Sequence, residues 1–300
     1  MLDQDVLAAF DGLLWLRTGE AVAERLGCTP STVSRLQRRC AALMGVNLER
    51  QAGEWQVTGD TTLLEMERDV HQMARFLKHR PLRLEATYWS APLLCAPLPS
   101  RWLLGLCNIV GIARNLQLVR ERIVDAWLAG LPDVPGEDDP ELTSLVLCHM
   151  PVHLVAAPTH PLCRQPSVTL EDLQAYPSLG LPAGAYPQVE AALKAMGLWN
   201  TTVRMRRYQR ELWEGQTEAA VTVGYGTALS LRLSDQQQVA LPLQLPITSG
   251  EALVVRREHR HHPCILALAT RLRRRLQRLA REHPEIVVLP DDQDTNRTEL

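Results

Sequence analysis

Short hydroxyl side chains and arginines are concentrated in one segment, residues 29–50 of the 300-residue chain. Hydroxyls exchange hydrogen bonds with base edges and phosphates, and the planar guanidinium of arginine binds guanine or a phosphate through two parallel hydrogen bonds. The chemistry that these residue types predict is recognition of duplex DNA. The candidate contacts are Thr29, Ser31, Thr32, Ser34, Arg35, Arg38 and Arg50.

An element that presents these side chains is predicted by three residues spaced as in a helix-turn-helix. Ala23 is small enough for two helices to pack closely, Gly27 permits a left-handed turn, and Val33 anchors the second helix in a core. A threonine precedes each helix as an N-cap. The pattern predicts a helix-turn-helix over residues 18–45, and the alternative is a surface helix of an unrelated helical domain.

The charge of the whole chain does not point to nucleic acid. Its formal net charge is −2 and its sequence pI is about 6.5. Residues 29–50 nevertheless hold four arginines and one glutamate, a net charge of +3. The electrostatic attraction for DNA is therefore expected to be local rather than global.

Two further elements are predicted to follow the recognition helix. Residues 48–58 read as a small hairpin, because the Ala52-Gly53 turn precedes an alternating Trp55 and Val57. A long helix then runs towards Lys78, and apolar residues recur along it with heptad spacing. Such a seam favours a partner helix, hence a dimer, over packing within its own domain. The seam consists of Leu63, Met66, Val70, Met73 and Leu77.

Alternation of strands and helices begins after Pro81 and predicts parallel α/β sheets in two lobes with a cleft. We expect strands at residues 82–86, 110–113, 144–148, 152–156, 178–181, 203–205, 229–231, 239–241 and 252–255. We expect helices at residues 119–128, 170–173, 186–196, 211–223 and 265–281.

Taken in order, these motifs resemble the LysR-type transcriptional regulators. The segment AVAERLGCTPSTVSRLQRRCAALMGVNLER, a strand ending in Thr58-Gly59, and then LRLEAT, LAGLPDV, VHLVAAPTHPL, VTLEDLQAYPSL and VTVGYGTALS stand where that family has its motifs. The resemblance covers residues 3–285. The chain departs from the family at three places. The family usually has its Pro one position later in the recognition helix, where this chain has Ser31, and it usually has a Phe near the position of Gly19. After Leu48 the family usually has Phe, and this chain has Glu49. These departures affect the set of DNA contacts rather than the fold.

The resemblance implies an effector domain like that of periplasmic binding proteins, with a small molecule held between two lobes. Crevices at the carboxyl ends of strands are also the usual ligand sites of open α/β sheets. Tyr88 and Trp89 indicate an aromatic or apolar ligand component, and residues 182–185 precede a helix whose N–H groups are expected to hold an anion. The candidate effector contacts are Thr87, Tyr88, Trp89, Ser90, Asn115, His149, Ala183, Gly184, Tyr225 and Thr227.

Several other classes of protein find no support in the sequence. There is no nucleophile elbow, P-loop, HExxH or dinucleotide motif, so we predict no catalytic residues and no cofactor. The adjacent His261 and His262 diverge, so we predict no metal site. The acidic N-terminus and the lack of a long apolar run predict no signal peptide and no membrane span. Seven cysteines without paired spacing suggest reduced thiols in a cytoplasm, with a redox sensor as the alternative.

The sequence thus predicts a cytoplasmic DNA-binding transcriptional regulator controlled by a small-molecule effector. Its partners would be double-stranded DNA, an anionic or aromatic effector, and further copies of itself in a homodimer or homotetramer, with RNA polymerase as a further partner. One alternative is a ligand-binding or enzymatic α/β protein with a helical dimerisation region, and another is a regulator without a ligand. The expected parts are a winged helix-turn-helix at 1–58, a dimerisation helix at 59–80, an effector domain at 81–290 (lobe I about 81–150 and 250–290, lobe II about 151–249) and a disordered tail at 291–300.

Overall fold

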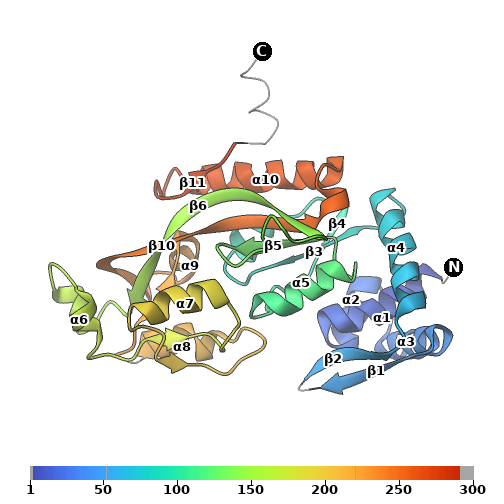
Figure 1. The fold of residues 1–300 in the computed structure, drawn as a ribbon, viewed down its shortest axis with the longest axis horizontal. Coiled ribbons are helices and arrows are strands. Elements are labelled where there is room, and N and C mark those ends of the chain that lie inside the picture. The colour runs from blue at the N-terminus through green and yellow to red at the C-terminus, as the bar shows by residue number, and fades with distance from the viewer. Residues whose placement is uncertain (1–2, 52, 220, 291–300) are drawn as a thin grey trace, which may run out of the picture. The chain divides into compact units, whose positions relative to one another are not determined.

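The structure, a computed structural model, describes residues 3–51, 53–219 and 221–290 (Figure 1). These residues form two compact units. The first unit comprises the described residues up to 85 together with 97–106 and 116–127, and the second comprises the remaining described residues. The predicted domains are continuous ranges of sequence, whereas these units are not, and the predicted boundaries stay a prediction. The predicted disordered tail at 291–300 lies outside the described residues.

The first unit contains the predicted helix-turn-helix and hairpin (Figure 1). The Thr18 hydroxyl accepts the Ala21 N–H at the start of the second helix, and Gly27 ends that helix in the left-handed conformation, at φ 64°. Both local predictions are therefore confirmed. The elements are α1 (Gln4–Leu16), α2 (Gly19–Leu26), α3 (Pro30–Met44), an antiparallel hairpin of β1 (Val46–Gln51) and β2 (Glu54–Gly59), and α4 (Thr62–Phe76).

The helices α1 and α2 also pack closely, at a contact outside the predicted motif. Ala23 is buried as expected. The closest approach, however, is made by Gly12 of α1, where a Cβ would lie 2.8 Å from Cγ1 of Val22. Gly12, which precedes the predicted motif, therefore gives α1 and α2 room to pack closely.

The second unit is built around two long strands, β6 (Leu142–Ala156) and β10 (Val239–Arg256), which pair antiparallel. On β6, β9 (Gly224–Gly226) and β11 (Val287–Val288) also pair antiparallel. The helix α10 (Pro263–Leu279) packs along β6 (Figure 1), and its residues Ile265, Leu268, Leu272 and Leu276 are buried.

Some predicted elements of the α/β region are confirmed, although the sheet is mixed rather than parallel. Parallel pairing occurs between β3 and β4 and between β7 and β8. A boundary between the two units falls within each of β3, α5 and β5. The bounds are β3 (Leu82–Ala86), η1 (Ala91–Cys95), β4 (Trp102–Leu104), α5 (Ile112–Arg120), β5 (Ala126–Gly130), η2 (Pro161–Arg164), α6 (Leu170–Leu173), β7 (Leu179–Gly180), α7 (Pro187–Ala195), β8 (Thr201–Thr202), η3 (Arg210–Leu212), α8 (Glu214–Ala219), α9 (Ala228–Leu233) and η4 (Arg257–His259).

Other predicted elements are wrong, for identifiable reasons. The predicted helix at 119–128 holds only the last two residues of α5, then a turn and the start of β5. All residues of β5 are buried, and a short buried strand cannot be told from a helix by periodicity. The predicted strand at 229–231 is the helix α9, which follows Thr227 as N-cap. At 110–113 the helix α5 begins in place of a strand, and at 203–205 the strand lies earlier, at β8. The predicted helix at 211–223 is only η3 and α8. The two strands predicted at 144–148 and 152–156 form the single strand β6. Those predicted at 239–241 and 252–255 form the single strand β10, which pairs with β6 with register shifts.

Candidate functional site

The recognition helix α3 is anchored on one side and free on the other. Val33 and Cys40 are buried at 1% and 0% exposure. Seven residues apart, they fix the inner face of the helix, and the residues between them turn outward. Arg35 and Arg38 are exposed, as is Arg39, which sequence reasoning left out of the contact set. The structure therefore brings three arginines together on the solvent side of α3.

Hydroxyl groups form a cluster at the start of α3. The Thr29 Oγ1 accepts the Thr32 N–H at 3.2 Å and lies 2.9 Å from Ser31 Oγ and 3.0 Å from Thr32 Oγ1. Ser31 is exposed, and Thr32 and Ser34 are half-buried. Thr29 therefore caps the helix in addition to any contact with DNA, and it holds two further hydroxyls at the same end.

The hairpin is attached to α1 through an arginine that sequence reasoning missed. Arg17 donates its Nε to the Gly53 carbonyl at 2.9 Å, and the Trp55 Nε1 donates to the Arg17 carbonyl at 2.7 Å. The predicted contact Arg50 is exposed, with its guanidinium 6.0 Å from the Trp55 ring centre. Arg17 and Arg50 thus lie at the same turn, which fixes the hairpin beside the helices.

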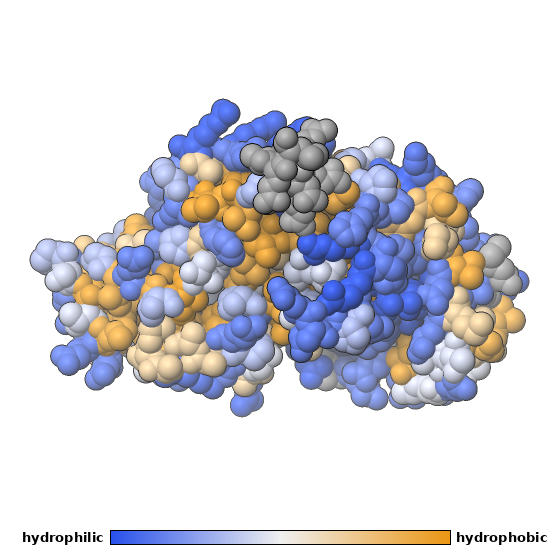
Figure 2. All heavy atoms as spheres, turned by 45° about the horizontal axis from the view of Figure 1, so that its top comes forward, coloured by the Kyte–Doolittle hydropathy of each residue, from blue (hydrophilic) through white to orange (hydrophobic). Residues whose placement is uncertain are grey.

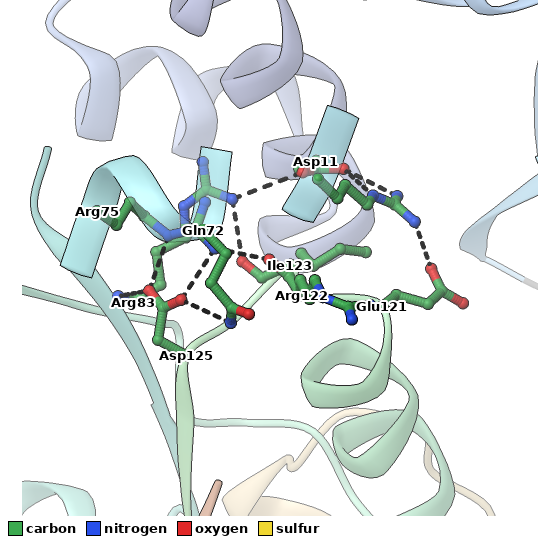
Figure 3. A network of polar contacts seen from close by, with 9 residues as sticks. Asp11, Gln72, Arg75, Arg83, Glu121, Arg122, Ile123 and Asp125 are labelled. Atoms are coloured by element: carbon green, nitrogen blue, oxygen red, sulfur yellow. Dashed lines mark hydrogen bonds and ion pairs between the residues drawn. The ribbon is translucent and has the colours of Figure 1, made fainter. Parts of the chain in front are cut away.

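A buried ion-pair network connects α1 with α4 (Figure 3). Arg68 on α4 donates from Nε and Nη2 to Asp11 of α1 at 2.9 and 2.8 Å, and from Nη1 to Glu121 at 3.0 Å. The side chains of Asp11 and Arg68 are 1% and 2% exposed. The helix that follows the helix-turn-helix is therefore fastened to it by charged groups that are withdrawn from water.

The same face of α4 contacts the segment that leads into β5 (Figure 3). Arg75 donates to both carboxylate oxygens of Asp125, at 2.8 and 2.9 Å, and Gln72 donates to it at 3.1 Å. The Arg83 N–H completes the set at 2.8 Å. Burial and the neighbouring Arg75 lower the pKa of the Arg83 side chain to about 10. Asp125 is fully buried and collects donors from α4 and β3.

The opposite face of α4 is apolar and exposed. Met66 is 62% exposed and Leu77 is 61% exposed. Figure 2 shows hydrophobic side chains interrupting the hydrophilic surface on the side where Figure 1 places α4. The whole predicted seam is exposed: Leu63, Met66, Val70, Met73 and Leu77. The other face of α4 is buried through its polar side chains. The seam itself is exposed, and no described residue covers it.

A cavity lies within the second unit, and apolar and aromatic side chains form most of its lining, as is typical of sites for small organic ligands. Six of the 14 aromatic residues of the chain line it. Among the described residues of the lining, Asp133 is the one charged side chain. The lining comprises Tyr88, Trp89, Gly130, Leu131, Asp133, Val152, Leu181, Tyr186, Val189, Trp199, Trp213, Tyr225, Gly226, Thr227, Ser230 and Ser249.

Four of the ten predicted effector contacts line this cavity: Tyr88, Trp89, Tyr225 and Thr227. The other six lie outside its described lining. Thr87 and Ser90 are buried and bond to each other, and Asn115 donates to the Gly111 carbonyl. His149 lies in β6 between β10 and β11. Ala183 and Gly184 are exposed before α7. Sequence reasoning missed Tyr186, Trp199 and Trp213, whose only signal was their aromatic character.

The N–H groups that were predicted to hold an anion near α7 already have acceptors within the chain. The Gly184 N–H donates to Glu190 at 2.7 Å. The Gln188 and Val189 N–H groups donate to Asp133 at 2.8 and 3.2 Å. Two carboxylates of the protein therefore occupy the donors that an anionic ligand would use.

Glu251 is a buried acid behind the cavity wall. Its Oε1 accepts the Trp89 Nε1 at 2.9 Å. Burial raises its pKa to about 8, although the hydrogen bonds from Trp89 and Ser90 act in the opposite direction. The carboxyl group is therefore held mainly in its neutral form near pH 7.

Glu251→Gln is expected to stabilise the protein increasingly as the pH rises. The folded state binds a proton on Glu251 between an unfolded pKa near 4.5 and a folded pKa of about 8, so this favourable contribution is complete below 4.5 and lost as the pH passes 8. Glutamine keeps the acceptor for Trp89 and has no charge to desolvate. The melting temperature of the variant should match the wild type at pH 5 and exceed it by about 4 °C at pH 9. An equal difference at both pH values, or a difference of the same size for the exposed Glu171→Gln, would contradict this assignment.

The described residues provide no group of three or more His, Cys, Asp or Glu side chains arranged to hold a metal ion. All seven cysteines lie in the described part of the chain and are free thiols. Burial raises the pKa of Cys40 and of Cys148 to about 12, so these two remain protonated. None of the helices in the described ranges is both long and apolar enough to span a membrane.

A helix-turn-helix with an outward arginine face, followed along the chain by an α/β unit that holds an aromatic-lined cavity, is the organisation of a ligand-responsive DNA-binding protein. The family model of the LysR substrate binding domain matches residues 110–277, more than half of the chain. The chain belongs to the LysR family of transcriptional regulators. A search of curated proteins gave no significant match.

Solved structures of full-length LysR-family regulators are similar to the chain in fold. A full-length OxyR variant from Pseudomonas aeruginosa aligns with a TM-score of 0.57 and 18% identity, over 91% of this chain and 95% of that one. CbnR in complex with its target DNA gives 0.52 and 17%, over 91% and 99%. A full-length BenM variant gives 0.51 and 16%, over 97% and 100%. At these identities the likeness establishes the shared fold.

Proposed function

We propose that the chain regulates transcription by presenting the arginine face of α3 to the major groove of duplex DNA, under control of an effector bound in the cavity of the second unit. The observation that carries the proposal is the exposed set Arg35, Arg38 and Arg39 on a helix anchored by Val33 and Cys40. The hydroxyls of Thr29, Ser31, Thr32 and Ser34 would contact bases or phosphates at the helix N-terminus. Arg50 would contact the backbone from the hairpin.

We further propose that two chains pair through the exposed seam of α4. A face of five large apolar residues at 46–62% exposure is unfavourable in water, and heptad spacing is the pattern that a second helix covers. A two-fold pair of α3 helices would then read two half-sites. Further pairing would give a tetramer, and contact with RNA polymerase would follow from binding beside a promoter.

The effector would act by binding one arrangement of the oligomer more tightly than another, since only differential affinity shifts an equilibrium. Tyr88, Trp89, Tyr225 and Thr227 are the predicted contacts that the cavity supports. Because its proposed partner is the chromosome, the protein would act in the cytoplasm. A regulator of this kind needs no catalytic group, and we propose no reaction.

Arg35→Ala and Arg38→Ala are each expected to weaken DNA binding by about 1–3 kcal/mol, because each removes a guanidinium from the groove face. Duplexes should first be selected from a random-sequence pool by the full-length protein. Fluorescence anisotropy then measures affinity over a range of salt concentrations. Arg274→Ala, an exposed arginine on α10, serves as the matched control and should leave affinity unchanged. Unaltered binding by both α3 variants, with folding intact, would overturn the assignment of this face.

A further inference from the structure

The chemical class of the effector can be narrowed from the walls of the cavity, on the basis of the proposed regulatory function. The aromatic rings of the lining are arranged as neighbours. Trp89 lies edge-on to Tyr88, with ring centres 4.9 Å apart, and Trp199 stacks with Tyr225 at 5.9 Å. Trp89 also lies 6.1 Å from Tyr186. A ligand in this cavity is therefore bounded by several aromatic rings, whose faces carry the negative part of the ring quadrupole.

Two glycines, Gly130 and Gly180, leave the space that the indole rings of Trp89 and Trp199 occupy. A Cβ on Gly130 would lie 2.8 Å from Cζ2 of Trp89, and a Cβ on Gly180 would lie 2.6 Å from Cδ1 of Trp199. Any side chain at either position would displace the ring. The sequence thus leaves room for both indoles to line the cavity.

The charge in the cavity is negative. Asp133 lines it, and among the described lining residues none is Arg, Lys or His. The carboxylate accepts two N–H groups at the start of α7, whose dipole supplies about half a positive charge, so the acid remains the dominant charge there. An anionic ligand would meet this carboxylate, and the N–H groups of Gln188 and Val189 are already occupied by it.

We propose that the cavity binds a small organic cation with an apolar or aromatic body, held by the aromatic faces and by the carboxylate of Asp133. Rings around a cation, with an acid beside them, are the arrangement that recognises alkylammonium groups. This proposal differs from the expectation of an anionic effector and keeps the aromatic part of that expectation.

The test measures binding of three probes to the full-length protein by titration calorimetry: benzyltrimethylammonium, 2-phenylethanol and phenylacetate. The cation should bind about tenfold more tightly than the neutral alcohol, and phenylacetate should bind most weakly. Equal or tighter binding of phenylacetate or 2-phenylethanol, or no binding of the cation at millimolar concentration, overturns the proposal.

Variants locate the binding and separate charge from shape. Asp133→Asn should weaken binding of the cation about tenfold and that of 2-phenylethanol less than about threefold, because the amide keeps the shape and one acceptor for α7. Trp89→Leu and Trp199→Leu should weaken both. Asp235→Asn, which removes an exposed acid from the same unit, should change neither. Unchanged affinity in both tryptophan variants would place the ligand elsewhere and reject the proposal.

The outcomes also separate this inference from the regulatory function on which it rests. A protein that binds selected DNA but not the cation rejects the effector class alone. A folded protein that binds the cation in this cavity but retains no specific duplex from the random pool rejects the regulatory function, while the ligand class stands.

Discussion

Arg68→Met is expected to lower the free energy of unfolding of the chain by about 3–5 kcal/mol. The substitution removes the guanidinium that holds both Asp11 and Glu121, and it leaves the Asp11 carboxylate, 1% exposed, with the more distant Arg83 at 3.8 Å. A buried charge without a close partner is among the costliest defects in a protein interior. Denaturant unfolding followed by circular dichroism would measure the loss.

A second substitution distinguishes an uncompensated charge from lost packing. Asp11→Leu added to Arg68→Met should restore much of the stability, because a pair of apolar residues of similar size carries no charge to desolvate. Asp5→Ala serves as the control, since its ion pair with Arg80 is half-exposed and should cost no more than about 1 kcal/mol. Additive losses in the double variant would show that the ion pair does not matter as a unit.

Met66→Lys combined with Met73→Lys is expected to convert the dimer into a monomer. Both methionines lie more than half exposed on α4, in the seam proposed to pair with a second copy. Two ammonium groups in each copy would then face their counterparts in an apolar interface. The dissociation constant of the dimer should rise by about 10³-fold or more, as measured by analytical ultracentrifugation.

The seam substitutions should leave the fold of each chain intact, because these side chains contribute little to its own core. Leu233→Lys, at an exposed leucine in the second unit, provides the control and should keep the wild-type mass. If the double variant keeps the wild-type mass too, the seam is not the interface. A monomer that binds DNA as tightly as the wild type would instead reject the need for paired recognition helices.

The DNA-binding end of the fold could be predicted from sequence because its determinants are local. Thr18 and Thr29 cap helices within three residues of themselves, and Gly27 alone supplies the turn. The apolar seam of α4 could also be predicted, from the heptad spacing of its residues. The polar face of α4 could not be predicted, because in the sequence Arg68 and Arg75 resemble solvated surface residues. Their partners Asp11 and Asp125 are about 50 residues away along the chain.

The cavity shows the opposite case. Its lining comes from segments spread between residues 88 and 249, so no single stretch of sequence reveals it. The predicted anion site near Gly184 failed for a related reason. Its N–H groups were correctly placed before a helix, but their acceptors, Glu190 and Asp133, were supplied by the chain itself. Packing between distant segments forms the cavity, and acceptors supplied by the chain itself occupy the N–H groups near Gly184.

The most direct test of the regulatory function is to map where the protein lies on the chromosome. Full-length wild-type protein and the Arg35→Ala/Arg38→Ala variant would be cross-linked in cells, and the recovered DNA sequenced. We predict that the wild type is enriched at discrete sites beside promoters that share one sequence motif, and that the variant loses this enrichment at equal protein level. An absence of discrete sites for the wild type, or an unchanged map for the variant, would contradict the function proposed for α3.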